Sequence, residues 1–177
     1  MTSYNFSEFP TLQTDRLTLR KIEKTDADVI LTLRSNPEMI KYLARPPIKS
    51  YKEASEIVDK ILDIMDKGEG VSWALTLKQN PTLIGTIGVW KFDGKGQTEI
   101  GYELAPEYHG LGVMQEAFIP VLKYTKDVLK CNTIVATVDP NNMPSIKRLL
   151  ANGFMKNKGF EETSEDGLKS HKYSLNL

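Results

Sequence analysis

Apolar residues alternate with polar ones in several short stretches of this chain, which is the pattern of half-buried β-strands. The alternation is clearest where polar side chains separate Leu17 from Leu19, and where Ile134, Ala136 and Val138 share one face. We expect strands at residues 14–20, 72–77, 83–90, 99–104 and 133–138, one that opens at residue 154, and a last one at residues 169–177.

Apolar residues at helical spacing predict helices between these strands. Thr25 and Asp26 should cap the first helix, and Ser50 with Glu53 forms a capping box at the third. Pro120 lies inside the fourth helix, where it removes one backbone hydrogen bond, so we expect a bend there. The expected helices are at residues 25–34, 37–43, 50–67, 112–130 and 143–152.

The order of these elements predicts the fold class. The three strands within residues 72–104 follow one another through short turns, which favours an antiparallel meander. A helix, a strand, a second helix and two strands complete the chain. We therefore expect an α/β (α+β) fold, in which helices flank one twisted, mixed and mostly antiparallel sheet of about seven strands. The chain has 177 residues and no long linker, so we expect residues 1–177 to form one domain.

Composition argues against several classes of function. The 23 basic and 23 acidic side chains give a formal net charge of zero, so we expect neither a nucleic-acid partner nor a membrane partner. Cys131 is the single cysteine, and His109 and His171 are the only histidines, so we expect no disulfide and no metal site. No apolar run approaches the ~20 residues of a membrane span. Residues 1–10 lack the pattern of a signal peptide, which favours a cytoplasmic location.

A strand, a turn and a helix at residues 98–117 carry the first candidate chemistry. Pro106 closes the strand, and Gly110 and Gly112 supply bare backbone where the helix begins. A helix N-terminus with small residues presents free N–H groups and a partial positive charge, which suits a phosphate. No Gly-Lys-Ser/Thr follows, which excludes a Walker P-loop. The residue three after Gly112 is Gln115, which excludes the dinucleotide fingerprint.

This turn resembles the pyrophosphate loop of the GNAT family of N-acetyltransferases, whose pattern is Gln/Arg-x-x-Gly-x-Gly/Ala. The strand before it reads Glu-Ile-Gly-Tyr-x-Leu, and residues 14–20 read Thr-x-Arg-Leu-x-Leu-Arg; both resemble the RimJ/RimL-like branch, which acetylates ribosomal-protein N-termini. Asn142-x-x-Ser145, followed by Gly153-Phe154, resembles a second family motif. The resemblance covers nearly the whole chain, and it implies a sheet in which two central strands splay apart. The residues at the loop are His109, Gly110, Leu111, Gly112, Val113 and Met114.

The resemblance also implies that acetyl-CoA is the co-substrate. The backbone of Tyr102, Glu103 and Leu104 would bind the pantetheine arm and the thioester carbonyl, and residues 109–114 would bind the pyrophosphate. His109 stands where Gln or Arg is usual, and a neutral imidazole still offers one donor.

The Asn-x-x-Ser motif would act at the thiol end of the co-substrate. We expect Asn142 to cap the helix that follows it, and Ser145 to lie near the sulfur. There the Ser145 hydroxyl would hydrogen-bond the sulfur or donate a proton to the leaving thiolate. Many relatives place a tyrosine seven residues after the asparagine for this purpose. Leu149 stands at that position, so Ser145 takes the role.

Glu99 is the first candidate for the base that deprotonates the amine, because some relatives carry a glutamate at a similar place on this strand. Glu103 is a rival, since residues 99, 101 and 103 share one face by alternation. Glu99 could instead serve as a structural ion-pair partner. Thr137 stands where another branch has a glutamate on the next strand, which leaves deprotonation through water open. We interpret Cys131 as structural.

The expected reaction is direct acetyl transfer to a primary amine, and by resemblance the acceptor is a protein N-terminal α-amine. A small-molecule amine or antibiotic is an alternative acceptor, and acidic residues at 161–167 could attract a cationic one. The chain could also be a non-catalytic acyl-CoA-binding module. A third alternative, an NTP-binding domain, predicts ATP binding without CoA binding. The sequence is compatible with a monomer or a homodimer.

Overall fold

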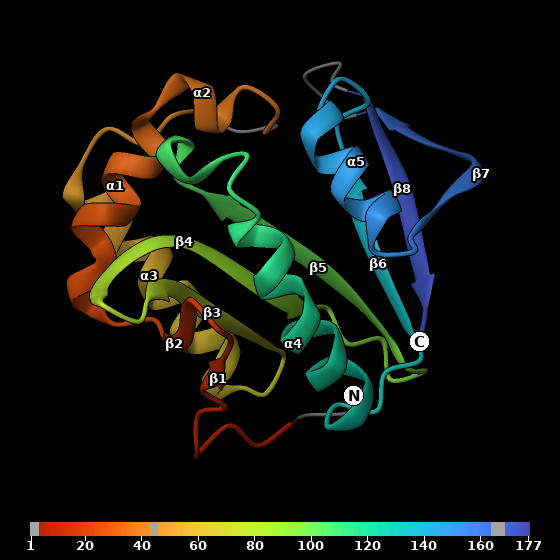
Figure 1. Cartoon of the computed structure of the whole chain (residues 1–177), viewed down its shortest axis with the longest axis horizontal. Coiled ribbons are helices and arrows are strands. Elements are labelled where there is room, and N and C mark those ends of the chain that lie inside the picture. The colour runs from red at the N-terminus through yellow and green to blue at the C-terminus, as the bar shows by residue number, and fades with distance from the viewer. Residues whose placement is uncertain (1–3, 44–45, 164–168) are drawn as a thin grey trace.

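The computed structural model describes residues 4–43, 46–163 and 169–177, and it centres on one mixed sheet of eight strands (Figure 1). The order across the sheet is β1–β2–β3–β4–β5–β6–β8–β7. All neighbouring pairs are antiparallel except β5 and β6, which are parallel. The expected fold class is therefore confirmed. The strands are β1 (Leu12–Gln13), β2 (Leu17–Lys21), β3 (Gly70–Leu77), β4 (Asn80–Trp90), β5 (Gln97–Leu104), β6 (Thr133–Val138), β7 (Met155–Thr163) and β8 (Lys169–Asn176).

The strand missing from the sequence prediction is β1, a two-residue strand paired with β2. Two residues are too few for an alternation pattern, so the sequence gives no signal for it. The expected meander is present, with β3, β4 and β5 joined in antiparallel register.

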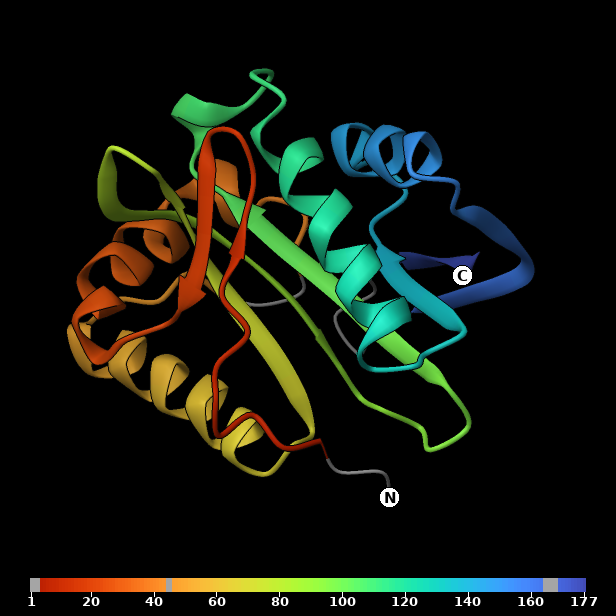
Figure 2. The same cartoon turned by 60° about the horizontal axis from the view of Figure 1, so that its bottom comes forward.

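Helices cover both faces of the sheet, as Figures 1 and 2 show. On one face α1 and α3 bury apolar residues such as Ile30 and Val58. On the other face α4 and α5 bury Phe118 and Leu149 in the larger of two core clusters. The helices are α1 (Ala27–Ser35), α2 (Pro37–Ile40), α3 (Tyr51–Asp66), α4 (Val113–Asp127) and α5 (Met143–Ala151), with 3-10 turns η1 (Lys24–Asp26) and η2 (Pro106–Tyr108).

The two central strands β5 and β6 pair over a short stretch only. Their register runs from Gln97 opposite Thr133 to Glu99 opposite Val135. Beyond that point β5 stays paired with β4 as far as Leu104, and β6 stays paired with β8. The two strands therefore splay apart, which confirms the expected split, and beyond Glu99 none of the described residues pairs as a strand with that edge of β5.

Two local expectations are corrected by the structure. Asp26 makes no side-chain cap on α1, because its buried carboxylate already accepts from the Arg20 guanidinium at 2.8 and 2.9 Å and from the Glu23 N–H at 2.8 Å. The helix expected to reach Lys130 ends at Asp127, and Lys130 has a positive φ of 53°, which is incompatible with a helix. α4 continues through Pro120, and the bend there stays a prediction.

None of the helices in the described ranges combines the length and the apolar character that crossing a membrane requires.

Candidate active site

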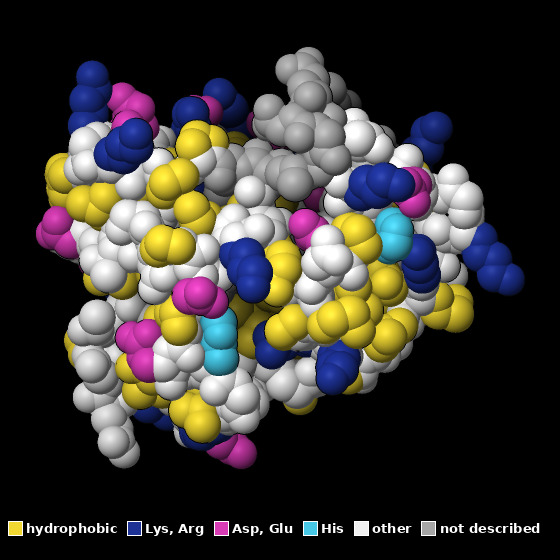
Figure 3. All heavy atoms as spheres, turned by 90° about the horizontal axis from the view of Figure 1, so that it is seen from above, with side chains coloured by type: hydrophobic (Ala, Val, Ile, Leu, Met, Phe, Trp, Pro, Cys, Tyr) yellow, Lys and Arg dark blue, Asp and Glu magenta, His cyan; other side chains and the backbone are white. Residues whose placement is uncertain are grey.

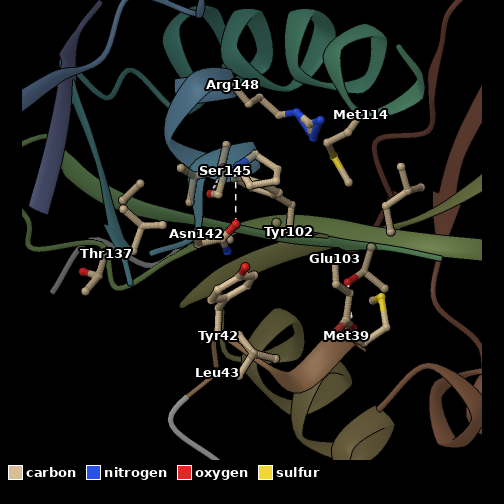
Figure 4. A pocket seen from close by; sticks show the side chains of 18 of the residues that line it. Met39, Tyr42, Leu43, Tyr102, Glu103, Met114, Thr137, Asn142, Ser145 and Arg148 are labelled. Carbon is tan, nitrogen blue, oxygen red and sulfur yellow. Dashed lines mark hydrogen bonds between the residues drawn. The ribbon is translucent and has the colours of Figure 1, made fainter. Parts of the chain in front are cut away.

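The divergence of β5 and β6 opens a cavity of about 1300 Å³ that reaches both faces of the sheet. On one face its lining includes Ser145 and Arg148 of α5 and the turn before α4. On the other face it includes Arg34 of α1 and Met39 of α2. Figure 4 shows the two sets of side chains on opposite sides of β5, and Figure 3 shows this side of the molecule hollowed near its centre. The cavity therefore gives two molecules separate approaches to one point in the sheet.

Tyr102 and Ser145 meet on the α4–α5 side of the cavity (Figure 4). The Tyr102 hydroxyl lies 2.6 Å from the Ser145 hydroxyl, and the Tyr102 ring packs edge-on against Phe118. Burial raises the pKa of the Tyr102 phenol, and the contact with Ser145 opposes this shift only in part. The phenol therefore stays protonated and available as a hydrogen-bond donor. Asn142 accepts the Ser145 N–H at 3.2 Å, so the expected cap on α5 is confirmed.

The turn between β5 and α4 presents backbone N–H groups without partners. Gly110 and Gly112 have φ values of 76° and 72°, a conformation that L side chains rarely adopt. Within the described part of the chain, the N–H groups of residues 110–114 donate no hydrogen bond. A Cβ at Gly110 would touch nothing within 4 Å, and one at Gly112 would meet only Arg16, at 3.5 Å. The turn therefore leaves open space in front of five donors, which fits a pyrophosphate.

His109 is turned back toward β5. Its Nε2 donates to the carbonyl oxygen of Leu104 at 2.7 Å, since a carbonyl can only accept. This bond uses the one N–H of a neutral imidazole. A phosphate contact through the His109 side chain would therefore require the protonated ring.

The carboxylate of Glu116 in α4 stabilises the turn between β5 and α4 through Arg16. Glu116 accepts hydrogen bonds from the Thr14 hydroxyl at 2.5 Å, the Arg16 N–H at 2.8 Å and the Arg16 Nε at 2.6 Å. Arg16 also donates to the carbonyl oxygen of Leu111, within the turn, at 2.9 Å. Burial alone would raise the pKa of Glu116, but these hydrogen bonds outweigh it and the pKa is lowered. The sequence placed Arg16 in a motif but did not predict its pairing with Glu116, because the two residues are 100 positions apart.

Glu99 and Glu103 both line the α1–α2 side of the cavity, and both are ion-paired. Glu103 is 9% exposed and binds Arg34 at 2.8 Å and the Thr86 hydroxyl at 3.2 Å. Glu99 is 19% exposed and binds Lys91 at 2.6 Å, and the Lys91 side chain is itself 70% exposed. Glu99 is therefore an ion-pair partner, as the alternative interpretation expected, and Lys91 is the residue that it pairs with.

Trp90 lies between these two carboxylates. Its indole covers Gly101, where an added Cβ would overlap the ring. This contact requires a residue without a side chain at position 101. Arg148 and the Tyr102 hydroxyl were not assigned roles, since the sequence does not show that α5 approaches β5.

Other candidates lie away from the cavity or outside the described residues. Cys131 is 4% exposed, and burial raises the pKa of its thiol, which fits the structural interpretation. Among the acidic residues at 161–167, Glu161 belongs to β7 and pairs with Lys169, whereas Glu165 and Asp166 are outside the described ranges. The described residues contain no cluster of three or more His, Cys, Asp or Glu that could hold a metal ion.

A splayed parallel pair inside a mostly antiparallel sheet, with a turn of unpaired N–H groups at its open end, is the architecture of an acetyltransferase of the GNAT fold. A family model described as an acetyltransferase (GNAT) domain matches residues 16–155. The chain is 37% identical over 147 residues to the N-acetyltransferase p20 of Bacillus licheniformis, covering 82% of this chain and 83% of that protein. It is 34% identical over 149 residues to the N-acetyltransferase YoaA of Bacillus subtilis (strain 168), covering 84% of each. The chain therefore belongs to the GNAT family and is an N-acetyltransferase.

A solved structure extends the likeness in fold. RimL, a ribosomal alpha-N-protein acetyltransferase in complex with coenzyme A, superposes with a TM-score of 0.83 at 16% identity. The match covers 95% of this chain and 98% of that one.

Proposed function

We propose that the protein transfers an acetyl group from acetyl-CoA directly to a primary amine, within a ternary complex. The observation that carries the proposal is a cavity that reaches both faces of the sheet at the splay of β5 and β6. A donor that enters beside α4 and α5 and an amine that enters beside α1 and α2 would meet there. No covalent enzyme intermediate is required, because proximity and orientation supply much of the rate.

The α4–α5 side of the cavity offers separate contacts for the pyrophosphate and for the pantetheine arm of acetyl-CoA. The N–H groups of residues 110–114 would hold the pyrophosphate, and the backbone of Tyr102, Glu103 and Leu104, where β5 has diverged from β6, would bind the pantetheine arm and polarise the thioester carbonyl. The two-residue separation of Tyr102 from Leu104 on one edge matches the extended shape of such an arm.

The thiol end would lie at Ser145. If the protonated Tyr102 phenol is the donor in its contact with the Ser145 oxygen, the Ser145 proton is left to point toward the sulfur. As the amine nitrogen bonds to the carbonyl carbon and the C–S bond breaks, the sulfur keeps the electron pair, and the Ser145 hydroxyl stabilises that thiolate with a hydrogen bond.

Glu99 is the better base of the two carboxylates. The Glu99 ion pair with the exposed Lys91 is of the kind worth about 0–1 kcal/mol, so releasing Glu99 costs little. Glu103 is held by a guanidinium in a buried setting, and freeing it would leave uncompensated charge. Glu99 would take the proton that the amine loses, directly or through a water.

The acceptor that we propose is a protein N-terminal α-amine, which is supported by the likeness to RimL. A small-molecule amine is the alternative. The test is an acetyl-CoA assay with N-terminal peptides, polyamines and aminoglycosides, read by release of free thiol. Thiol release with peptides supports the proposal, and release with polyamines or aminoglycosides alone supports the small-molecule acceptor. CoA binding without turnover of any amine would indicate an acyl-CoA-binding module, and ATP binding without CoA binding would overturn the site assignment.

A further inference from the structure

Arg148 is a charged side chain of the cavity that the proposed reaction leaves unused. It comes from α5, one turn after Ser145, and it lines the cavity together with Gly110 and Met114. In Figure 4 its guanidinium points toward the first turn of α4, where Met114 lies. The guanidinium carbon is 5.9 Å from the centre of the Tyr102 ring.

The Arg148 guanidinium has no polar partner in the described part of the chain. It is partly buried, and burial lowers its pKa, yet it makes no hydrogen bond and no ion pair there. A guanidinium carries five N–H donors and stays charged at any working pH. A partly buried cation that has only an aromatic face beside it is incompletely compensated.

The other basic groups near the turn are already engaged. Arg16 is bonded to Glu116 and to the Leu111 carbonyl, and His109 is bonded to the Leu104 carbonyl. Arg16 therefore lies beside the turn but is already paired, whereas Arg148 lines the same cavity and has no anionic partner among the described residues. The N-terminus of α4 and the guanidinium are both positive, so they repel each other until an anion lies between them.

We propose that Arg148 pairs with a phosphate group of the acyl-CoA donor, across the cavity from the turn at residues 110–114. This inference rests on the proposed function, because it assumes that a CoA thioester enters beside α4 and α5. The guanidinium would bind two phosphate oxygens in its planar fork, while the backbone N–H groups bind others. The phosphate could belong to the pyrophosphate or to the 3′-phosphate of the donor, and the choice of donor in the assay separates these sources.

The test compares Arg148→Gln with Lys147→Gln, which removes the same charge from an exposed neighbour on α5. We expect Arg148→Gln to lower kcat/KM for acetyl-CoA by about 10- to 100-fold, the value of one charge-assisted hydrogen bond or ion pair, mainly through KM. Lys147→Gln should behave as wild type. With S-acetylpantetheine, which lacks the pyrophosphate and the nucleotide, Arg148→Gln and wild type should have equal kcat/KM.

Two results would overturn the proposal. The first is an unchanged kcat/KM of Arg148→Gln with acetyl-CoA. The second is an equal loss with S-acetylpantetheine, which would place Arg148 at the thioester end through Tyr102. A loss that persists with acetyl-dephospho-CoA supports pairing with the pyrophosphate, and a loss that disappears supports pairing with the 3′-phosphate.

Calorimetric titration with CoA keeps this test separate from the proposed function. If wild type binds CoA but turns over no amine, the affinities of the two variants still decide the role of Arg148, with a weaker Arg148→Gln complex expected. If wild type binds no CoA at all, the proposed function itself fails. Thermal unfolding of both variants checks that neither substitution has disturbed the fold.

Discussion

Replacing Glu116 by alanine should destabilise the protein and weaken CoA binding, because the Glu116 carboxylate binds Thr14 and Arg16 and Arg16 holds the turn. The carboxylate accepts three hydrogen bonds, from the Thr14 hydroxyl and from the N–H and Nε of Arg16. Hydrogen bonds to a charged group are worth about 1.5–3 kcal/mol each. The Arg16 side chain is 49% exposed, so its ion pair falls to about 0–1 kcal/mol. The hydrogen bonds from the Thr14 hydroxyl and the Arg16 N–H remain, and losing both should lower the free energy of unfolding by about 3 kcal/mol.

The matched control is Asp127→Ala in the same helix. Asp127 also makes a short ion pair, with Lys123 at 2.5 Å, but both side chains are largely exposed. Its loss should cost much less than the loss of Glu116, because ion pairs between exposed side chains contribute little to stability. Urea unfolding measures both values, and CoA titration measures the effect on the turn, since losing the Arg16 bond to the Leu111 carbonyl frees the turn to move. Equal costs for the two variants would show that the burial and donor count at Glu116 do not matter, and would refute the reasoning.

The same carboxylate predicts a pH dependence. The folded-state pKa of Glu116 is lowered, so its contribution to stability is fully present above the unfolded value of about 4.3 and is lost as pH falls through the folded pKa. Glu116→Gln cannot ionise, so the stability gap between wild type and this variant should be constant near neutral pH and close below about pH 4. A gap that does not change between pH 7 and pH 3 would contradict the assignment.

Three further predictions test the proposed site. Gly112→Glu should abolish CoA binding, and the positive φ at this position should cost about 1–2 kcal/mol in the free energy of unfolding. Gly159→Glu is the control: its positive φ should cost the same, but it should bind CoA normally. Normal CoA binding by Gly112→Glu would refute the loop assignment. Ser145→Ala and Tyr102→Phe should each lower kcat by about 10-fold with little further loss when combined, because the two hydroxyls act as one unit; fully additive losses would separate them. Glu99→Gln should lower kcat by about 100-fold while the affinity for acetyl-CoA stays at the wild-type value, and an unchanged kcat across pH would leave water as the base.

The individual strands could be predicted before the structure because they depend on local signals, whereas the splay was expected from the resemblance. Alternation at Leu17 and Leu19, or at Ile134 and Val138, needs only neighbouring residues, and the strand order together with the motif at residues 98–117 carried the resemblance that implies the split sheet. The cap by Asn142 is local in the same way. The alternation within each strand and the cap by Asn142 therefore need only residues that are close together along the chain.

The contacts that shape the site are long-range, and no local pattern predicts them. Arg16 meets Glu116 across 100 residues, and Tyr102 meets Ser145 across 43. Their positions follow from packing α4 and α5 on the sheet, which the spacing of apolar residues does not specify. The hydrogen bond from His109 to the Leu104 carbonyl was likewise not predicted, although His109 was expected to donate a hydrogen bond to a phosphate. The bond forms because the 3-10 turn η2 brings the imidazole back onto β5.

β5 serves both substrates because alternate residues of a strand point to opposite faces. Tyr102 faces α4 and α5, where it meets Ser145, whereas Glu99 and Glu103 line the side of α1 and α2. A slip of one residue would exchange these two sets, so the register of β5 against β4 must be secured. The indole of Trp90 lies over Gly101, where any side chain would overlap it, and a slip would bring Tyr102 or Ile100 beneath the ring instead. The close contact of Trp90 with Gly101 therefore holds donor chemistry and acceptor chemistry on their proper sides of the sheet.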